Sequence, residues 1–134
     1  MEAKLMDMQD LVKDFLKQRR FAVVGSFRNE SKYAYQILKT LKNREYEVYP
    51  VNPSLKEVDN LICYPSVKDI PIVCDVANII TSPKITEKIV QECKEKGITR
   101  VWLQPGAESH EVIEFCQENN IKVIYDLCVM LEKI

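Results

Sequence analysis

Glycine is scarce in this chain, and several signals of common protein classes are missing. Only 3 of its 134 residues are glycine, which excludes collagen-like and glycine-rich flexible chains. The 19 basic and 20 acidic residues leave a formal net charge of −1, with one histidine counted as neutral. Without a basic excess, we expect no broad binding to the phosphate backbone of nucleic acid.

Long apolar runs are also missing. No run approaches the roughly 18 residues that would span a bilayer. The N-terminal stretch MEAKLMDMQDLVKDF carries a charge every few positions, so it indicates neither a signal peptide nor an anchor. We therefore expect a cytoplasmic protein with no membrane partner.

The five cysteines show neither CxxC nor CxxH spacing, and their number is odd. This pattern indicates neither a disulfide framework nor a zinc site, so no metal is expected. Most of them lie in apolar surroundings, where reduced cysteine acts as a small core residue. They are Cys63, Cys74, Cys93, Cys116 and Cys128.

Short apolar segments alternate with helical patterns along the rest of the chain. Apolar residues at helical spacing predict an amphipathic helix over residues 5–18. Five apolar segments rich in branched residues predict strands buried on both faces, as in a parallel sheet. These segments are FAVVG (21–25), YEVYPV (46–51), DVANII (75–80), RVWLQ (100–104) and IKVIYDL (121–127).

Helical patterns occupy the connections between the predicted strands. Apolar spacing over residues 34–41 indicates one helix, and Ser82-Pro83 and Gly97 mark the start and end of the next. A third pattern precedes Asn119, a short helix is expected at the C-terminus, and residues 54–71 are predicted to be irregular with short helical turns.

This alternation predicts a doubly wound, Rossmann-like α/β fold. A sheet of about five parallel strands would carry helices on both faces. We expect one domain over residues 1–134, with residues 1–20 forming an N-terminal helix packed on it.

In such sheets a ligand binds beyond the carboxyl ends of the strands. The first loop there begins with Gly25, which would let the backbone turn close to a ligand, and a helix begins near Ser31. Arg28 and Lys32 would add positive charge, so the loop suits a pyrophosphate. Alternatively, Gly25 only makes a tight turn and both cations are solvated.

Two sequence features bear on which nucleotide cofactor the loops would bind. The GxGxxG pattern is absent, because Phe27 and Glu30 stand where glycines would be. The end of the second strand, Val51-Asn52-Pro53, lacks the acidic residue that binds the adenosine ribose of NAD. A neutral edge tolerates a phosphorylated ribose, which favours coenzyme A or NADP over NAD. Alternatively, the prolines merely end the sheet.

Several motifs, in this order, resemble one protein family. VVG near the start, YPVNP after the second strand, WLQPG after the fourth and the closing DLC are similar to the small CoA-binding domain proteins. Those proteins resemble the Rossmann-like domain of the succinyl-CoA ligase α subunit. The likeness runs from about Phe21 to Cys128. It implies a fold that binds coenzyme A or an acyl-CoA, with no assigned reaction.

The resemblance also implies where the ligand lies. The phosphate loop would comprise residues 25–28 with Lys32, residues 51–53 would border the adenosine, residues 82–83 would cross the cofactor, and residues 104–106 would lie toward the pantetheine. One departure is Phe27, which replaces a hydroxyl residue of the family and adds bulk. The implied positions are Gly25, Ser26, Phe27, Arg28, Lys32, Val51, Asn52, Pro53, Ser82, Pro83, Gln104, Pro105 and Gly106.

The chain shows no arrangement typical of catalysis, so we expect no catalytic residue. His110 is expected to be an exposed residue in the first turn of a helix, and Trp102 a core residue. Cys128, at the end of the fifth strand, is either a buried structural thiol or a thiol that forms a mixed disulfide with a cofactor.

Three functions remain open from the sequence. The first is a CoA-binding protein without a reaction of its own. The second is an NADP-dependent oxidoreductase or another nucleotide-binding enzyme, for which Asp126, Cys128, Tyr33 or Tyr35 would have to transfer protons. The third is a regulatory or interaction module that has lost its ligand. No protein partner can be named.

Overall fold

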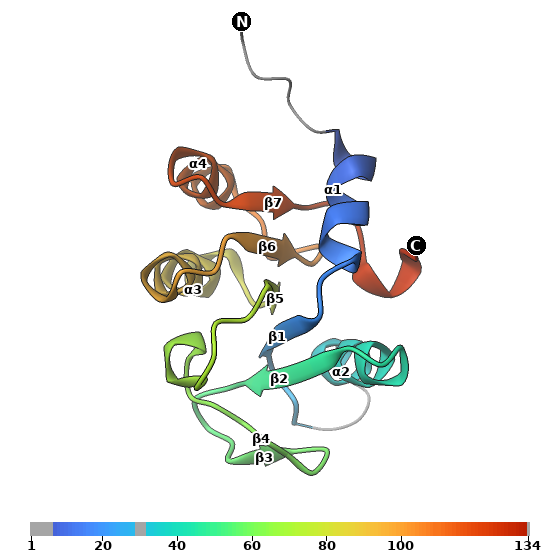
Figure 1. Ribbon diagram of the computed structural model, residues 1–134. Helices are drawn as coiled ribbons and strands as arrows, with labels where there is room; N and C mark the ends of the chain where they lie inside the picture. Colours follow the sequence, from blue (N-terminus) through green and yellow to red (C-terminus); the bar gives the residue numbers. More distant parts are fainter. Residues whose placement is uncertain (1–6, 29–31, 134) are drawn as a thin grey trace, which may run out of the picture.

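A five-stranded parallel sheet forms the centre of the protein in the computed structural model, which describes residues 7–28 and 32–133 (Figure 1). The strand order is β2-β1-β5-β6-β7. The strands are β1 (Arg20–Gly25), β2 (Glu47–Val51), β5 (Val76–Ile80), β6 (Arg100–Leu103) and β7 (Lys122–Ile124). The predicted Rossmann-like α/β fold is therefore confirmed.

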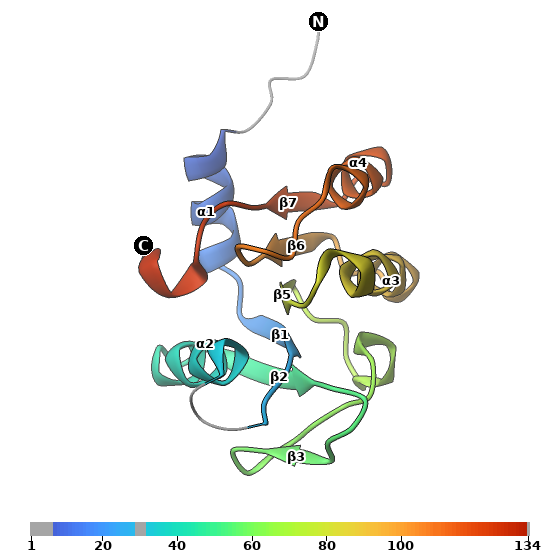
Figure 2. The same cartoon turned by 180° about the vertical axis from the view of Figure 1, so that it is seen from behind.

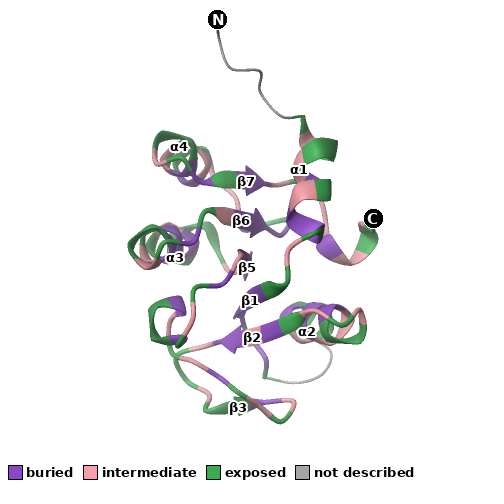
Figure 3. Cartoon of the chain, in the orientation of Figure 1, coloured by how far each residue is buried: buried purple, intermediate pink, exposed green. Residues whose placement is uncertain are grey.

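Helices cover both faces of the sheet, as Figures 1 and 2 show from opposite sides. On one face lie α1 (Met8–Leu16) and α2 (Tyr33–Asn43); on the other lie α3 (Pro83–Lys96) and α4 (His110–Glu118). Each face has its own apolar cluster, one including Phe15 and Trp102, the other Val90 and Val101. The central strands are buried and the outer faces of the helices exposed (Figure 3). This explains why the strand segments are continuously apolar.

The helix signals in the sequence place α3 correctly. Ser82 is its N-cap residue, Pro83 is the first helical residue, and the helix ends at Gly97, whose φ is +94°. The apolar spacing in the sequence also predicts that Ile85 lies on the buried face with Ile89, Val90 and Cys93, and for Ile85 this is wrong. Ile85 is 54% exposed, and Thr86 is buried in its place. Because Thr86, Ile89, Val90 and Cys93 have the spacing of one helix face, Ile85 falls beside the face that contacts the sheet.

A small hairpin lies where the sequence predicted only irregular structure. β3 (Glu57–Val58) pairs antiparallel with β4 (Leu61–Ile62), and the 3-10 turn η1 (Val67–Asp69) follows. Asp59 and Asn60 form the turn with φ of 51° and 65°, as a two-residue type I′ turn requires. The Asp59 carboxylate lies 3.1 Å from the Lys42 Nζ, so the turn is attached to α2.

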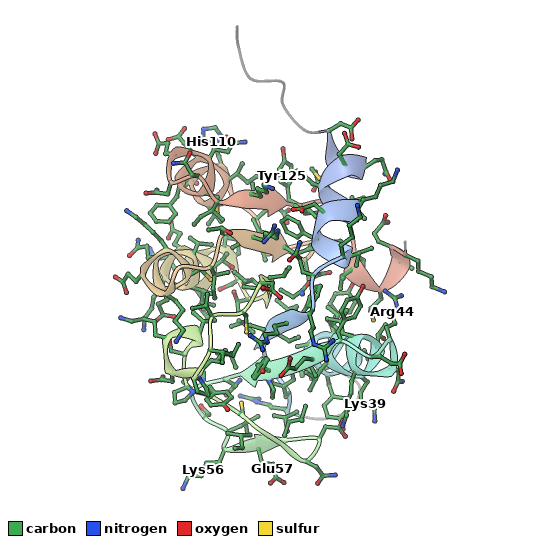
Figure 4. The ribbon with its side chains drawn as sticks, in the orientation of Figure 1. Lys39, Arg44, Lys56, Glu57, His110 and Tyr125 are labelled. Carbon is green, nitrogen blue, oxygen red and sulfur yellow. The ribbon has the colours of Figure 1, made fainter. Side chains whose placement is uncertain are left out.

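The C-terminal segment ends in the 3-10 helix η2 (Val129–Leu131), the predicted terminal helix. β7 ends earlier than the apolar run suggests, because Asp126 adopts a positive φ of 63° that breaks the extended backbone. Arg44, labelled in Figure 4, donates hydrogen bonds to the main-chain oxygens of Val129, Met130 and Glu132. The end of α2 thus anchors this segment.

Candidate functional site

The carboxyl ends of the strands form the candidate site. The order of the sheet reverses between β1 and β5, since β1 is followed along the chain by β2 on one side and later by β5 on the other. In open parallel sheets such a reversal opens a crevice for a ligand. The structure brings the loops after all five strands to this edge, and the predicted site residues of the described chain lie in these loops or, for Lys32, next to α2.

The first loop depends on Gly25 because neighbouring elements pack closely against it. Its φ is not in the left-handed region, so it does not serve as a special turn residue. A Cβ atom added at Gly25 would lie 2.8 Å from the Cβ of Ala34 and 3.0 Å from the carbonyl oxygen of Ile80. Glycine is needed because α2 and β5 approach the end of β1 closely.

The residues that follow Gly25 in the first loop differ in exposure, some facing solvent and one lying in the core. Ser26 and Arg28 are exposed, whereas Phe27 is only 5% exposed and belongs to the apolar cluster of the α1 and α2 face. Lys32 is exposed at the N-cap position of α2, and its own side chain makes no capping hydrogen bond. The predicted helix start near Ser31, and Glu30, lie outside the described residues.

The second loop is fastened to the first by Asn52. The Asn52 Nδ2 donates to the main-chain oxygen of Gly25 at 2.8 Å, and its Oδ1 accepts from the main-chain nitrogen of Ser54 at 2.8 Å. Val51 is buried and Pro53 is exposed. No carboxylate stands in the segment 51–53, so the edge beside β2 is uncharged there.

The loops after β5 and β6, the third and fourth loops of this edge, border an open hollow of about 280 Å³. Its lining residues are Ile80, Thr81, Ser82, Pro105, Gly106 and Ala107. Three of these residues, Ser82, Pro105 and Gly106, are among the predicted positions. The neighbouring Pro83 is exposed. The lining is uncharged, although the Glu108 carboxylate accepts a hydrogen bond from the Gly106 main-chain nitrogen at 3.0 Å. Such a lining suits a neutral chain better than a phosphate.

Gln104 lies beneath this edge rather than on it. Its side chain is fully buried, with Nε2 donating to the Asn78 Oδ1 at 3.1 Å and Oε1 accepting from the Val129 main-chain nitrogen at 3.1 Å. Both ends of the amide are thus engaged within the protein. Within the described chain, the Nδ2 atom of buried Asn78 has no hydrogen-bond partner.

Cys128 lies beside the start of α2. Its sulfur and the Tyr33 hydroxyl form a hydrogen bond. Burial and this contact raise the pKa of Tyr33 to about 12. Cys128 is partly exposed, whereas the other four cysteines are buried. Burial raises the pKa of both Cys74 and Cys116 to about 12, so these thiols stay protonated and unreactive.

The remaining chemically active side chains lie elsewhere. His110 begins α4 and is exposed, as predicted, with its Nε2 3.3 Å from the Glu114 carboxylate (Figure 4). Trp102 is fully buried, as predicted. In residues 7–28 and 32–133, no group of three or more His, Cys, Asp or Glu side chains could hold a metal ion. No helix of that part is long and apolar enough to span a membrane.

Sequence searches found matches among curated proteins. The acetate–CoA ligase (ADP-forming) II subunit alpha of Pyrococcus furiosus is 32% identical over 128 residues, which cover 86% of this chain and 28% of that protein. The Bacillus subtilis protein YneT is 27% identical over 119 residues, covering 88% of each chain. The chain spans less than a third of the length of the acetate–CoA ligases that it matches.

Solved structures share the fold along nearly the whole chain. A hypothetical protein from Pyrococcus horikoshii superposes with a TM-score of 0.87 at 30% identity, covering 97% of this chain and 94% of that one. A conserved hypothetical protein from Pyrococcus furiosus superposes with a TM-score of 0.82 at 37% identity, covering 86% of this chain and 99% of that one. The family model described as "CoA binding domain" matches residues 19–133. The chain therefore belongs to the CoA-binding domain family.

Proposed function

We propose that this protein binds coenzyme A or an acyl-CoA at the carboxyl edge of its sheet and has no reaction of its own. The observation that carries the proposal is the position of the loops. The motifs of a CoA-binding family lie together at the edge where the strand order reverses.

The diphosphate would lie at the first loop. The exposed cations Arg28 and Lys32 flank this loop, and α2, an 11-residue helix, begins beside it with no acidic residue in its first turn. A helix N-terminus and nearby cations both stabilise an anion. The uncharged segment 51–53 would border the adenosine and leave room for its additional phosphate.

The pantetheine would run toward the hollow between the third and fourth loops. Its lining of small, hydroxyl and apolar residues fits a neutral chain with amide groups. In this arrangement Ser82 and Pro83 border the middle of the ligand and Pro105 and Gly106 its thiol end, while buried Gln104 supports the fourth loop from below.

A panel of nucleotides tests the proposal. Because a ligand that binds only the folded protein stabilises it by mass action, millimolar CoA should raise the melting temperature by several degrees. NADP, NAD and ATP serve as comparisons under the same conditions. A larger shift with NADP would favour an oxidoreductase, and a melt unchanged by all four compounds would contradict a nucleotide site.

Charge reversal at Lys32 tests where the phosphates lie. Replacing Lys32 with glutamate places negative charge beside the proposed diphosphate, so the dissociation constant for CoA should rise about tenfold. Calorimetry at low salt measures this change. Lys17→Glu is the matched control, because Lys17 is an exposed lysine that precedes β1 at the opposite edge. Equal affinity of Lys32→Glu and wild type would remove Lys32 from the site.

A further inference from the structure

We infer that Asn52 is a positioning residue, which holds the first loop in its binding conformation by replacing a hydrogen bond that proline cannot make. The inference rests on the proposed function, since it gives the Asn52 side chain a role in ordering the proposed phosphate loop. It starts from the pairing of β1 with β2, the edge strand next to it.

The hydrogen-bond ladder between these strands stops at Pro53. At the start of the ladder the main-chain oxygen of Arg19 accepts from the nitrogen of Glu47 at 3.0 Å, and Val24 lies opposite Val51 further along. Alternate residues of a strand face the same neighbour, so the oxygen of Gly25 faces β2 as that of Arg19 does. Arg19 O and Glu47 N are 28 residues apart, and the same spacing makes the main-chain nitrogen of residue 53 the expected donor to the oxygen of Gly25. Residue 53 is proline, which has no N–H to donate.

The Asn52 side chain supplies the missing donor. Its Nδ2 lies 2.8 Å from the Gly25 oxygen, a normal hydrogen-bond length. Its Oδ1 accepts from the nitrogen of Ser54, and its own main-chain nitrogen donates to the oxygen of Tyr64 at 2.9 Å. One residue therefore joins the end of β1, the turn after β2 and the segment that follows β4.

This arrangement determines what Asn52 can do. Both polar atoms of its side chain are engaged with the main chain, so the residue acts through the first loop. Gly25 is buried, and loss of the donor would leave its carbonyl without this partner. The loop would then have to be ordered by the ligand, which weakens binding.

Alanine substitution with a matched control separates positioning from stability. Asn52→Ala should raise the dissociation constant for CoA about tenfold. Asn119→Ala removes a very similar bond, from Asn119 Nδ2 to the main-chain oxygen of Phe115 at 2.7 Å, at the C-cap of α4. It should leave the affinity for CoA unchanged. Both affinities are measured by calorimetry well below the melting temperatures.

A rescue variant tests the mechanism directly. Replacing Pro53 with alanine in the Asn52→Ala background restores a main-chain N–H that can donate to the Gly25 oxygen, so the double variant should regain most of the lost affinity. If Asn52→Ala does not fold, Asn52→Ser replaces it, because a serine hydroxyl can still accept from the main-chain nitrogen of Ser54 and adds no charge.

The outcomes distinguish the inference from the function that it rests on. Wild-type protein that fails to bind CoA contradicts both. Binding by wild type together with unchanged affinity in Asn52→Ala, an equal loss in Asn119→Ala, or no recovery in the double variant overturns the positioning role alone.

Discussion

At the scale of single residues, the packing of the first loop requires that residue 25 has no Cβ atom. At Gly25, α2 and β5 pack against the end of β1, and an added Cβ would lie 2.8 Å from the Ala34 Cβ and 3.0 Å from the Ile80 carbonyl oxygen. One of the two contacting atoms is a main-chain oxygen, which cannot rotate away. The spacing between the end of the strand and the start of the helix therefore depends on glycine.

Substitution of Gly25 by alanine should lower the free energy of unfolding by about 2 kcal/mol, the range typical of overpacking. Urea denaturation measures the change. Shortening the opposing residue in the double variant Gly25→Ala, Ala34→Gly should recover part of it, because one of the two clashes is relieved. Full stability of the single variant would show that α2 is not held against β1 as described.

At the scale of elements, α1 is attached to the sheet by apolar packing and by one carboxylate. Val12, Phe15 and Leu16 are buried in the cluster on that face. Asp14 lies 2.9 Å from the Arg100 Nε and 3.4 Å from the Lys122 Nζ. The hydrogen bond from Arg100 outweighs the effect of burial and lowers the pKa of Asp14 below its ordinary value.

This pKa shift makes part of the stability dependent on pH. Because the pKa of Asp14 is lower in the folded than in the unfolded protein, its stabilising effect is present above the unfolded pKa of about 3.9 and is lost as the pH falls through the folded value. Asp14→Asn should cost about 1 kcal/mol at pH 7. Between pH 7 and pH 3, denaturation curves should then show a smaller decline in the free energy of unfolding for Asp14→Asn than for wild type. Parallel curves for the two proteins would contradict the role of Asp14.

At the scale of the whole molecule, the two edges of the sheet differ in chemistry. The amino edge carries ion pairs at the strand starts. Arg20 of β1 lies 3.2 Å from Glu47 of β2, and Arg100 of β6 pairs with Asp14 of α1. The carboxyl edge carries proline-containing and small-residue loops, with an uncharged hollow between the third and fourth. The edge proposed to bind the ligand is therefore built from loops, whereas charged pairs join the elements at the opposite edge.

The fold could be predicted from the sequence because its signals are local. Five continuously apolar segments and the Ser82-Pro83 and Gly97 helix ends each specify one element without reference to the rest. The β3–β4 hairpin was missed although Asp59-Asn60 is typical of a two-residue turn. Its strands have only two residues each, and the hairpin is stabilised by Lys42 and Lys39 of α2, a contact between distant segments.

The candidate site was predictable only as a set of loops. The parallel topology places those loops at one edge, so the sequence predicts the position of the candidate site without any knowledge of side-chain contacts. The burial of Phe27, the engagement of Gln104 with Asn78, and the bond from Asn52 to Gly25 depend on three-dimensional packing. No spacing in the chain reveals them.

Chemical-shift mapping tests the central claim most directly, since a 15.6 kDa protein is well suited to amide spectra. Titration of 15N-labelled protein with CoA should move the amide signals of residues 25–28, 51–54, 81–84 and 104–107 most, while those of α1 and of the strand starts remain in place. Shifts confined to the amino edge, or none at saturating CoA, would contradict a CoA site at the carboxyl edge.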